Sequence, residues 1–332
     1  MSKVFPRLGR RRALPAAAAG AVVLGLLLWW LLPLGEKPPS GTIVFSTGTP
    51  RGVYQEYGER LRAEFAKDMP DLKVKLLNSA GSQENVQRVA TGRADFTIAA
   101  ADAVEEYELA HGSGAGRLRG VARLYDDYVH LIVRSDSGIR NIADLRHKRV
   151  AIGLPDSGVR LIADRVLRAS GIDPRKDITP FPDGIDTGPD RLERGGIDAF
   201  FWSGGLPTKG LVGLARKGAF KFVPIEGDVV TRLHGQGQES RYYRATNIPE
   251  SAYPAVQQGN EVPTLAVSNL LMTRTDVDPR LTEWVTRTVI KSRDGIGAHV
   301  HSAQLVDLRT AIYTDPLPLQ EGARRYYREV KP

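Results

Sequence analysis

The sequence predicts an α/β fold of two lobes, in which each lobe is a mostly parallel sheet flanked by helices. Two observations carry this prediction: short apolar runs alternate with helical stretches, and an apolar run at 128–134 leads into a second round of that alternation. Strand–loop–helix units in series favour parallel sheets with helices on both faces. A third observation, the uncharged apolar run at 13–34, places a transmembrane segment before the fold.

The N-terminal segment has the features of a signal anchor. Residues 13–34 carry no charge, and about twenty apolar residues are enough to cross a bilayer. Basic residues precede this run, so the positive-inside rule sends the rest of the chain outward. No small-x-small cleavage site follows Leu34, which favours an uncleaved anchor over a removed signal peptide, although secretion after cleavage stays open. We therefore assign 1–40 to a basic n-region, an anchor and a linker, and expect the remainder at the extracytoplasmic face of the cell membrane.

Composition indicates a globular protein and excludes several classes of site. Hydrophobic residues make up 42% and charged residues 25% of the 332 residues, as is usual for soluble domains. The net charge is +8, but five basic residues and no acid precede Gly35, which leaves +3 (8 minus 5) for the rest. The basic excess therefore lies in the leader and does not predict a nucleic-acid partner. Cysteine is absent, which excludes a lipid-modified cysteine, disulfides and thiolate metal sites.

The alternation divides the chain into two lobes. We expect lobe I to comprise 41–127 plus 263–332 and lobe II to comprise 128–262. The expected strands are 42–47, 72–77, 95–100, 128–134, 148–153, 197–202, 220–225 and 264–269. The expected helices are 54–67, one that follows the loop 78–82 and runs through Val86, Val89 and Ala90, 159–169, and three in the tail at 278–294, 302–312 and 320–330.

Three loops share one design, because each follows a strand, is rich in Gly and Ser, and opens a helix. Helix N-termini leave N–H groups unpaired and carry partial positive charge, so they hold carboxylates or phosphates. In open α/β sheets such loops lie at the carboxyl ends of the strands, where ligands bind. The candidate ligand-binding residues in them are Gly48, Thr49, Tyr54, Gly81, Ser82, Asn85, Asp156, Ser157 and Gly158. We expect Ser82 and Ser157 to face each other across a cleft, with simple helix capping as the alternative role.

Aromatic residues near these loops complete the candidate site, and catalytic motifs are missing. Tyr54, Tyr125 and Trp202 could each form a wall of a ligand pocket and donate one hydrogen bond. The chain has no GxSxG, HExxH, P-loop or EF-hand sequence. His299 and His301 are two residues apart, a spacing that does not bring them to one helix face. We therefore predict no catalytic residue, no metal site and no cofactor.

Five segments together resemble one known family, the TAXI-type solute-binding subunits of TRAP transporters. They are TGTPRGVYQEYG (47–58), AGSQENVQRVATGRADFTIAAAD (80–102), LYDDYVHLIVRSDSGIRNIADLRHKRVAIGLPDSG (124–158), GGIDAFFWSGGLP (195–207) and PLQEGARRYYRE (318–329). The resemblance implies a periplasmic-binding-protein type II fold, a hinge between the lobes, and no catalysis. It also implies an amino acid or carboxylic acid as ligand and a TRAP-type permease as partner. Asp102, at the end of the second segment, joins the candidate ligand residues.

Departures from the family pattern affect the expected ligand. Ala80 stands where the family often has Gly, Ala100 where Gln is usual, and Asp156 where Gly is usual before the serine. A negative charge at Asp156 would work against a dianion, whereas an ammonium group could pair with it. Two other functions stay open: a membrane-tethered receptor that senses ligand without transport and, remotely, an enzyme on the same fold.

Overall fold

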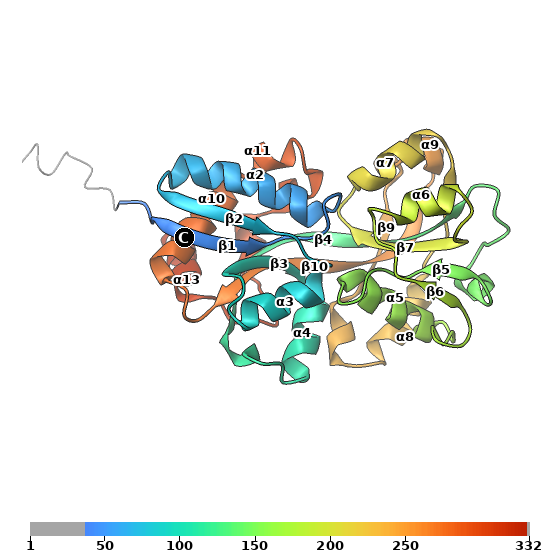
Figure 1. The fold of residues 1–332 in the computed structure, drawn as a ribbon, viewed down its shortest axis with the longest axis horizontal. Helices are drawn as coiled ribbons and strands as arrows, with labels where there is room; N and C mark the ends of the chain where they lie inside the picture. Colours follow the sequence, from blue (N-terminus) through green and yellow to red (C-terminus); the bar gives the residue numbers. More distant parts are fainter. Residues whose placement is uncertain (1–36, 331–332) are drawn as a thin grey trace, which may run out of the picture. The chain divides into compact units, whose positions relative to one another are not determined.

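The computed structural model describes residues 37–330, and the chain from Pro39 onward forms one compact unit (Figure 1). The anchor predicted at 13–34 lies outside the described residues. Within residues 37–330, no helix has both the length and the apolar character needed to cross a membrane.

A single ten-stranded sheet runs through the described region, in the order β2-β1-β3-β10-β4-β7-β5-β6, with β8 beside β4 and β9 beside β10. The strands are β1 (Gly41–Ser46), β2 (Leu72–Leu77), β3 (Phe96–Ala100), β4 (Leu118–Arg134), β5 (Arg149–Ala151), β6 (Thr179–Phe181), β7 (Ala199–Gly204), β8 (Phe220–Phe222), β9 (Arg244–Ile248) and β10 (Val262–Arg274). β1 is parallel to β2 and β3, and β5 is parallel to β6 and β7.

The prediction of mostly parallel sheets is wrong. β4 and β10 run antiparallel to each other, and every other strand that pairs with either of them is also antiparallel to it. These two strands are far longer than the predicted 128–134 and 264–269. Each continues from one half of the sheet into the other, and this continuity brings antiparallel pairing into both halves.

The two long strands separate at the middle of the molecule. β4 and β10 pair from Leu118 opposite Arg274 to Tyr128 opposite Ala266. Beyond that point the chain after β8 lies between them, because Val223 N–H donates to the Leu131 carbonyl (2.8 Å) and Ile225 N–H to the Pro263 carbonyl (2.9 Å). β4 and β10 therefore connect the two halves, and the pairing between these two strands ends where one half meets the other.

Helices cover both faces of each half (Figure 1). α2, α10 and α11 lie on one face of the first half and α3 and α4 on the other, while α6, α7 and α9 lie opposite α5 and α8 in the second half. The helices are α2 (Val53–Asp68), α3 (Ser82–Ala90), α4 (Ala101–Leu109), α5 (Gly158–Ala169), α6 (Gly188–Glu193), α7 (Lys209–Arg216), α8 (Gly227–His234), α9 (Pro254–Gln257), α10 (Pro279–Lys291), α11 (Arg293–Gly297), α12 (Leu308–Ala311) and α13 (Glu321–Val330). Short 3₁₀ turns are η1 (Ala115–Arg117), η2 (Ile142–Leu145), η3 (Gln238–Tyr242), η4 (Glu250–Ala252) and η5 (His301–Leu305).

Two predicted tail helices are shorter than expected. The segment 278–294 is divided into α10 and α11 at Ser292, and 302–312 contains η5 and the single-turn α12. The second break has a local cause, since the Asp307 carboxylate accepts the Arg309 N–H at 2.7 Å and starts a new helix.

Each half of the sheet has its own hydrophobic core. One core includes Leu131, Val166 and Phe200, and the other includes Phe45, Phe65 and Val285. The expected lobe boundaries, 127/128 and 262/263, fall inside β4 and β10, the strands that both halves share.

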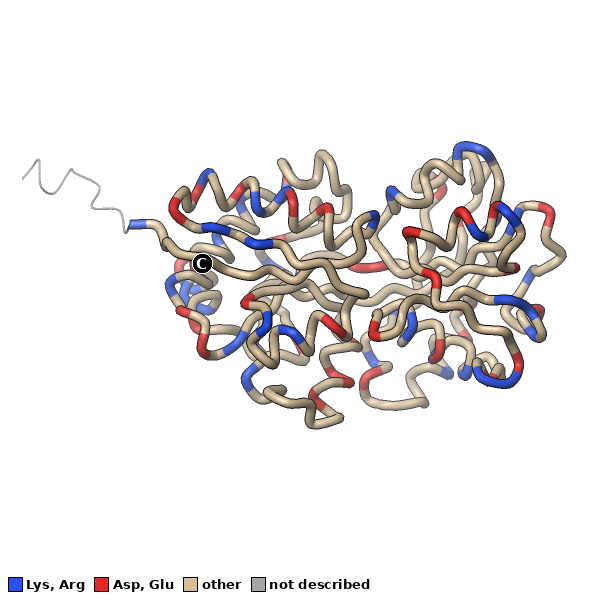
Figure 2. The backbone as a smooth tube through the Cα atoms, viewed as in Figure 1, with Lys and Arg blue, Asp and Glu red and all other residues tan. Residues whose placement is uncertain are grey.

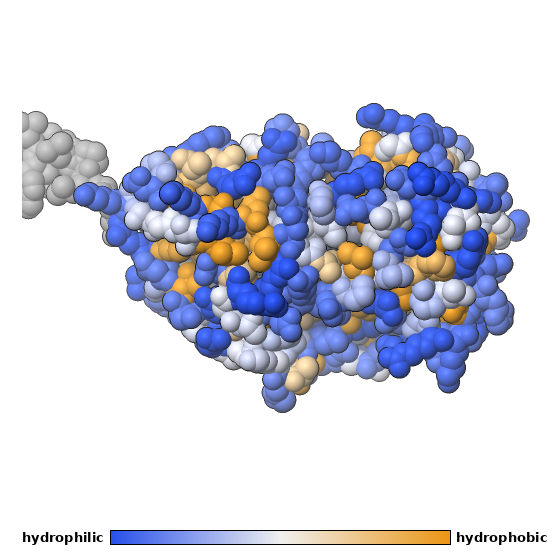
Figure 3. Space-filling view, viewed as in Figure 1, coloured by the Kyte–Doolittle hydropathy of each residue, from blue (hydrophilic) through white to orange (hydrophobic). Residues whose placement is uncertain are grey.

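Charge is distributed over both halves. Basic and acidic residues are interspersed along the tube (Figure 2), and the viewed surface is mainly hydrophilic with smaller apolar areas (Figure 3). This mixture has the character of a solvated surface and not of a one-sign patch for nucleic acid.

Candidate ligand pocket between the two halves

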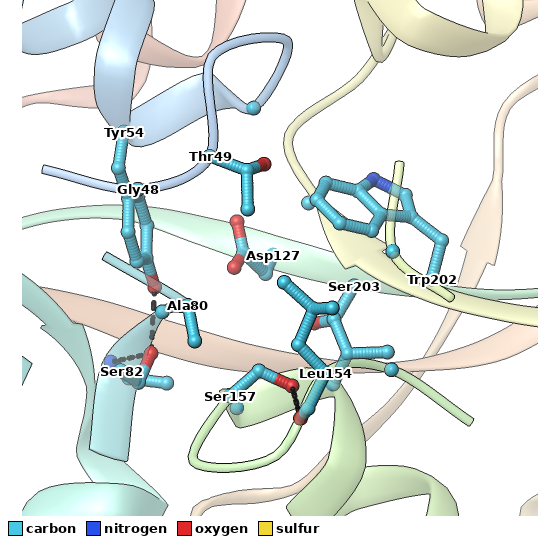
Figure 4. A pocket seen from close by; sticks show the side chains of 18 of the residues that line it. Gly48, Thr49, Tyr54, Ala80, Ser82, Asp127, Leu154, Ser157, Trp202 and Ser203 are labelled. Carbon is cyan, nitrogen blue, oxygen red and sulfur yellow. Dashed lines mark hydrogen bonds between the residues drawn. The ribbon is translucent and has the colours of Figure 1, made fainter. Parts of the chain in front are cut away.

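A pocket opens between the two halves, lined by loops that follow β1, β2, β5 and β6, by the ends of β3 and β7, and by one residue of β4 (Figure 4). Most of these positions lie at or just beyond the carboxyl ends of strands, as in other open α/β sheets. Eight of the predicted site residues line it: Gly48, Thr49, Tyr54, Gly81, Ser82, Ser157, Gly158 and Trp202.

Three helices begin at this pocket. α2 and α3 start from the first half, and α5 starts from the second, so that their N-termini approach one space. The first N–H groups of a helix have no partner within the helix, and the helix dipole adds partial positive charge there. The pocket therefore offers backbone donors for an anionic group from both halves.

The loops of α3 and α5 touch across the pocket. Glu84 N–H donates to the Asp156 carbonyl at 3.0 Å, and a Cβ on Gly81 would stand 3.4 Å from the Ser157 Cα. A Cβ on Gly158 would stand 3.0 Å from the Ser82 Oγ. Glycine at 158 allows this close approach, whereas glycine at 81 allows the positive φ of 141°. The loops are in contact, and the described structure is therefore a closed arrangement of the two halves.

Ser82 and Ser157 do lie on opposite sides of the contact, but their hydroxyls have different local partners. Ser157 caps α5, since its Oγ accepts the Arg160 N–H (3.1 Å) and donates to the Leu154 carbonyl (2.7 Å). Ser157 therefore has the alternative role named in the sequence analysis, which is helix capping. Ser82 makes no cap and instead accepts the Ala100 N–H at 3.1 Å, which links α3 to the end of β3.

Tyr54 is held by a chain of hydrogen bonds. Its hydroxyl donates to the Asn269 Oδ1 (2.5 Å), so Ser82 Oγ, 3.0 Å away, donates to the Tyr54 oxygen. Burial raises the pKa of Tyr54 well above its usual range, and the negative charge of Asp127 adds to the effect. The phenol therefore stays protonated and forms a fixed wall of the pocket.

Asp127 is a pocket residue that the sequence analysis missed. It is the one charged residue among those that line the pocket in the described region, it is 4% exposed, and its Oδ1 has no hydrogen-bond partner. Burial, together with the negative charges of nearby Asp126 and Asp102, raises the pKa of this carboxyl to about 7. A useful signal was available, because paired acids at Asp126 and Asp127 are unusual inside an apolar strand.

Other lining residues provide hydroxyls and apolar walls. Ser203 Oγ and Thr49 Oγ1 are buried without partners, and Leu154 and Ile162 from the second half supply apolar surface. The Trp202 ring is oriented by its Nε1–H, which donates to Thr208 Oγ1 at 3.0 Å.

Two predicted site residues, Asn85 and Asp102, lie outside the pocket lining. Asn85 is fully buried and donates to the Thr47 (2.7 Å) and Ile98 (3.0 Å) carbonyls, so it fixes the loop after β1. Asp102 accepts from the Tyr243 hydroxyl (2.7 Å) and from Arg165 Nη1 (3.3 Å). Asn85 and the Oδ2 atom of Asp102 are therefore engaged within the protein, and Asp102 Oδ1 is buried without a partner outside the pocket lining.

Tyr125 and Asp156 are also absent from the pocket lining. Tyr125 is buried in the first half, where its ring stacks on Tyr57 with centroids 5.9 Å apart. Asp156 has a left-handed backbone with φ of 60° and an exposed side chain that borders a separate surface depression. The Asp156 side chain therefore lies outside the pocket in which we expected it to pair with a ligand ammonium.

Two half-sheets joined by two long strands, with a pocket between them, define the fold class of the periplasmic solute-binding proteins. A putative L-cystine ABC transporter protein from Listeria monocytogenes has this fold, with a TM-score of 0.50 and 16% identity over 80% of this chain and 98% of that one. A protein from Bordetella bronchiseptica RB50 is similar at a TM-score of 0.50 and 17% identity, over 87% of this chain and 82% of that one. The alkanesulfonate-binding protein SsuA from Xanthomonas axonopodis pv. citri, bound to MOPS, aligns with a TM-score of 0.47 and 15% identity, over 88% of this chain and 84% of that one.

The chain belongs to the NMT1-like family, whose model matches residues 45–330. At the identities above, the two structures with a TM-score of 0.50 establish the shared fold and no more. The predicted α/β solute-binding-protein fold is therefore confirmed. Membership of the TAXI type is a finer prediction than the family and the fold, and these comparisons do not reach it.

Proposed function

We propose that this protein is an extracytoplasmic solute-binding receptor that captures an amino acid or a carboxylic acid between its lobes and delivers it to a membrane permease. The observation that carries the proposal is the pocket between the two halves. Its polar atoms at Thr49, Asp127 and Ser203 are buried without partners in the protein, so a ligand can satisfy them. Three helix N-termini open onto the same space.

The proposed action is binding followed by release, without catalysis. Closure brings the loops of α3 and α5 together over the ligand, and opening at the separation of β4 and β10 frees it. No cofactor or metal takes part. An enzyme on this fold is the less favoured possibility, because Asp127 has no second acid or base beside it in the pocket lining.

The class of permease is the finer part of the proposal. The sequence resemblance favours a TRAP-type partner, whereas the similar protein from Listeria monocytogenes is assigned to an ABC transporter. A tethered sensor that binds ligand without transport is the alternative function. Uptake of the bound metabolite in cells with and without this chain separates the two, since loss of uptake requires a transport role.

The ligand itself is accessible to one direct experiment. Native mass spectrometry of the 41–332 fragment purified from cells should show a bound metabolite of small mass that is released on denaturation. Fragment without any bound or bindable small molecule would contradict the receptor function.

The membrane anchor, proposed for 13–34, needs a separate test. Intact-mass analysis of the membrane fraction should find Arg12 and Trp30 in one polypeptide with the folded unit. A mature form that begins near Gly35 to Gly41 would instead show a removed signal peptide.

A further inference from the structure

We infer that the ligand carries a protonated amine that pairs with the Asp127 carboxylate, and that it carries no more than one anionic group. This inference rests on the proposed solute-binding function and narrows its ligand class to amino acids and similar zwitterions or cations.

The first step is the charge of the pocket wall. Asp127 is the charged member of the described lining, and no arginine or lysine belongs to that lining. The arginines around it are engaged elsewhere: Arg51 with Asp186, Arg165 with Asp102, and Arg123 and Arg244 with Asp126. The ionisable groups that face Asp127 are Asp126, Asp102, Tyr54 and Tyr125, and none of these carries positive charge. The acidic pocket wall therefore has no counter-ion from the protein.

The second step is the direction and burial of the carboxylate. Figure 4 shows Asp127 at the centre of the pocket, between Tyr54 on one side and Trp202 on the other. Its Oδ1 has no partner and its side chain is almost completely removed from solvent. An ionised carboxylate is costly to bury unpaired, and an ammonium group that enters the pocket would offset this cost with a charge-assisted hydrogen bond.

The third step is the fit of an amine to the neighbouring groups. An ammonium group has three N–H donors, and the unpaired Ser203 Oγ offers a second acceptor. The face of Trp202, fixed by its bond to Thr208, is also a favourable neighbour for a cation. Asp127, Ser203 and Trp202 all line the same pocket.

The last step places the anionic end of the ligand. Gly158 and Val159 begin α5, and their N–H groups precede the first intrahelical bond, so they are donors for one carboxylate. A second anionic group would lie near Asp127 with no basic side chain to balance it. Dicarboxylates without an amine are therefore expected to bind poorly.

Matched pairs of compounds test this inference directly. Each standard L-amino acid and the 2-oxoacid of the same carbon skeleton would be screened by thermal shift and calorimetry against the full chain and Asp127→Asn. Native mass spectrometry of both proteins, after exposure to a total metabolite extract, covers ligands outside that panel. The amine-bearing member of a pair should bind the wild type, and Asp127→Asn should weaken it by about tenfold to a hundredfold.

Asp126→Asn is the matched control, because Asp126 is the next residue on β4 and its carboxylate pairs with Arg123 and Arg244 outside the pocket lining. Its affinity for the amine ligand should stay within about threefold of the wild type, since its charge is already balanced by those arginines. A bound molecule that lacks a basic nitrogen, or an Asp127→Asn variant that binds as well as the wild type, would overturn the amine inference and leave the receptor function intact. Failure to retain any small molecule from the panel or the extract would instead contradict the receptor function itself.

Discussion

Asp127 combines three properties in a residue that lines the pocket: deep burial, an unpaired oxygen and acidic neighbours. Burial raises its pKa to about 7, far above the usual range for an aspartate. Such perturbed groups concentrate at functional sites because function keeps a charge where stability alone would remove it. The residue therefore contributes unfavourably to the stability of the ligand-free protein at neutral pH.

The pH dependence of stability should show this contribution. Because the folded pKa of Asp127 lies above the unfolded value, its stabilising effect is complete below about pH 4 and is lost as pH rises through 7. Asp127→Asn should therefore be more stable than the wild type at pH 8, by up to about 4 kcal/mol at ~1.4 kcal/mol per pKa unit, and by only about 1 kcal/mol near pH 4.5. Denaturant unfolding of the two ligand-free proteins at both pH values measures this difference in the free energy of unfolding. An equal difference at both pH values would mean that Asp127 does not titrate as described.

At the scale of elements, several contacts hold the halves in the closed arrangement, and two of them differ in kind. One is the backbone contact between the α3 and α5 loops, where Gly158 allows close approach. The other is the side-chain cluster in which Arg165 of α5 meets Asp102 and Glu106 of α4. The first contact is steric and the second electrostatic, so substitutions can test them separately.

Gly158→Ala tests the steric contact. Its added Cβ would meet Ser82 Oγ at 3.0 Å and Ser82 Cβ at 3.2 Å, and this crowding arises only when the halves are closed. Ligand affinity should therefore fall by about tenfold, equivalent to ~1.4 kcal/mol, while the melting temperature of the ligand-free protein stays nearly unchanged. Gly213→Ala on exposed α7 is the control, because a Cβ there meets nothing within 4 Å. Unchanged affinity in Gly158→Ala would show that the loops do not approach this closely with ligand bound.

Arg165→Met tests the electrostatic contact. Arg165 Nη1 also donates to the Tyr243 hydroxyl at 2.8 Å. Removal of the Arg165 guanidinium leaves the Asp102 carboxylate buried without a cation. Loss of one partner of a buried ion pair costs about 3–5 kcal/mol, and that loss should appear in the free energy of unfolding. Arg160→Met on the same helix breaks the more exposed pair with Asp164 and should cost less than about 1 kcal/mol. Similar losses in both variants would argue against a special role for the α4–α5 cluster.

At the scale of the whole molecule, β4 and β10 are both the connection and the expected hinge. They pair through the first half with two shifts of register and separate beyond Tyr128 and Ala266, where the chain after β8 enters between them. The hinge predicted at 128–134 and 264–269 therefore coincides with a real change in strand pairing. Bending at that point would open the pocket without unfolding either core.

Small-angle scattering of the 41–332 fragment checks this motion. Saturating ligand should reduce the radius of gyration, and the bound profile should match the closed arrangement described for residues 37–330. The ligand-free profile should correspond to a more extended particle, because no ligand then links the two halves across the pocket. Identical profiles with and without saturating ligand would contradict a hinge-bending receptor.

Eight of the ten described strands, and the three loops that meet at the pocket, were predicted from the sequence because they depend on local periodicity and turn chemistry. The sequence analysis did not predict β6, β9 or the helices α4 and α6 to α9. Strand 72–77 was predicted with the same bounds as β2, and helix 159–169 differs from α5 by one residue. Only the tertiary structure decided which polar residues face the ligand space. Asp127 lies in a strand that is mostly buried, where alternation does not mark one face. Asp102 has the same residue type, yet its partner Tyr243 is 141 positions away, and that pairing removes it from the pocket.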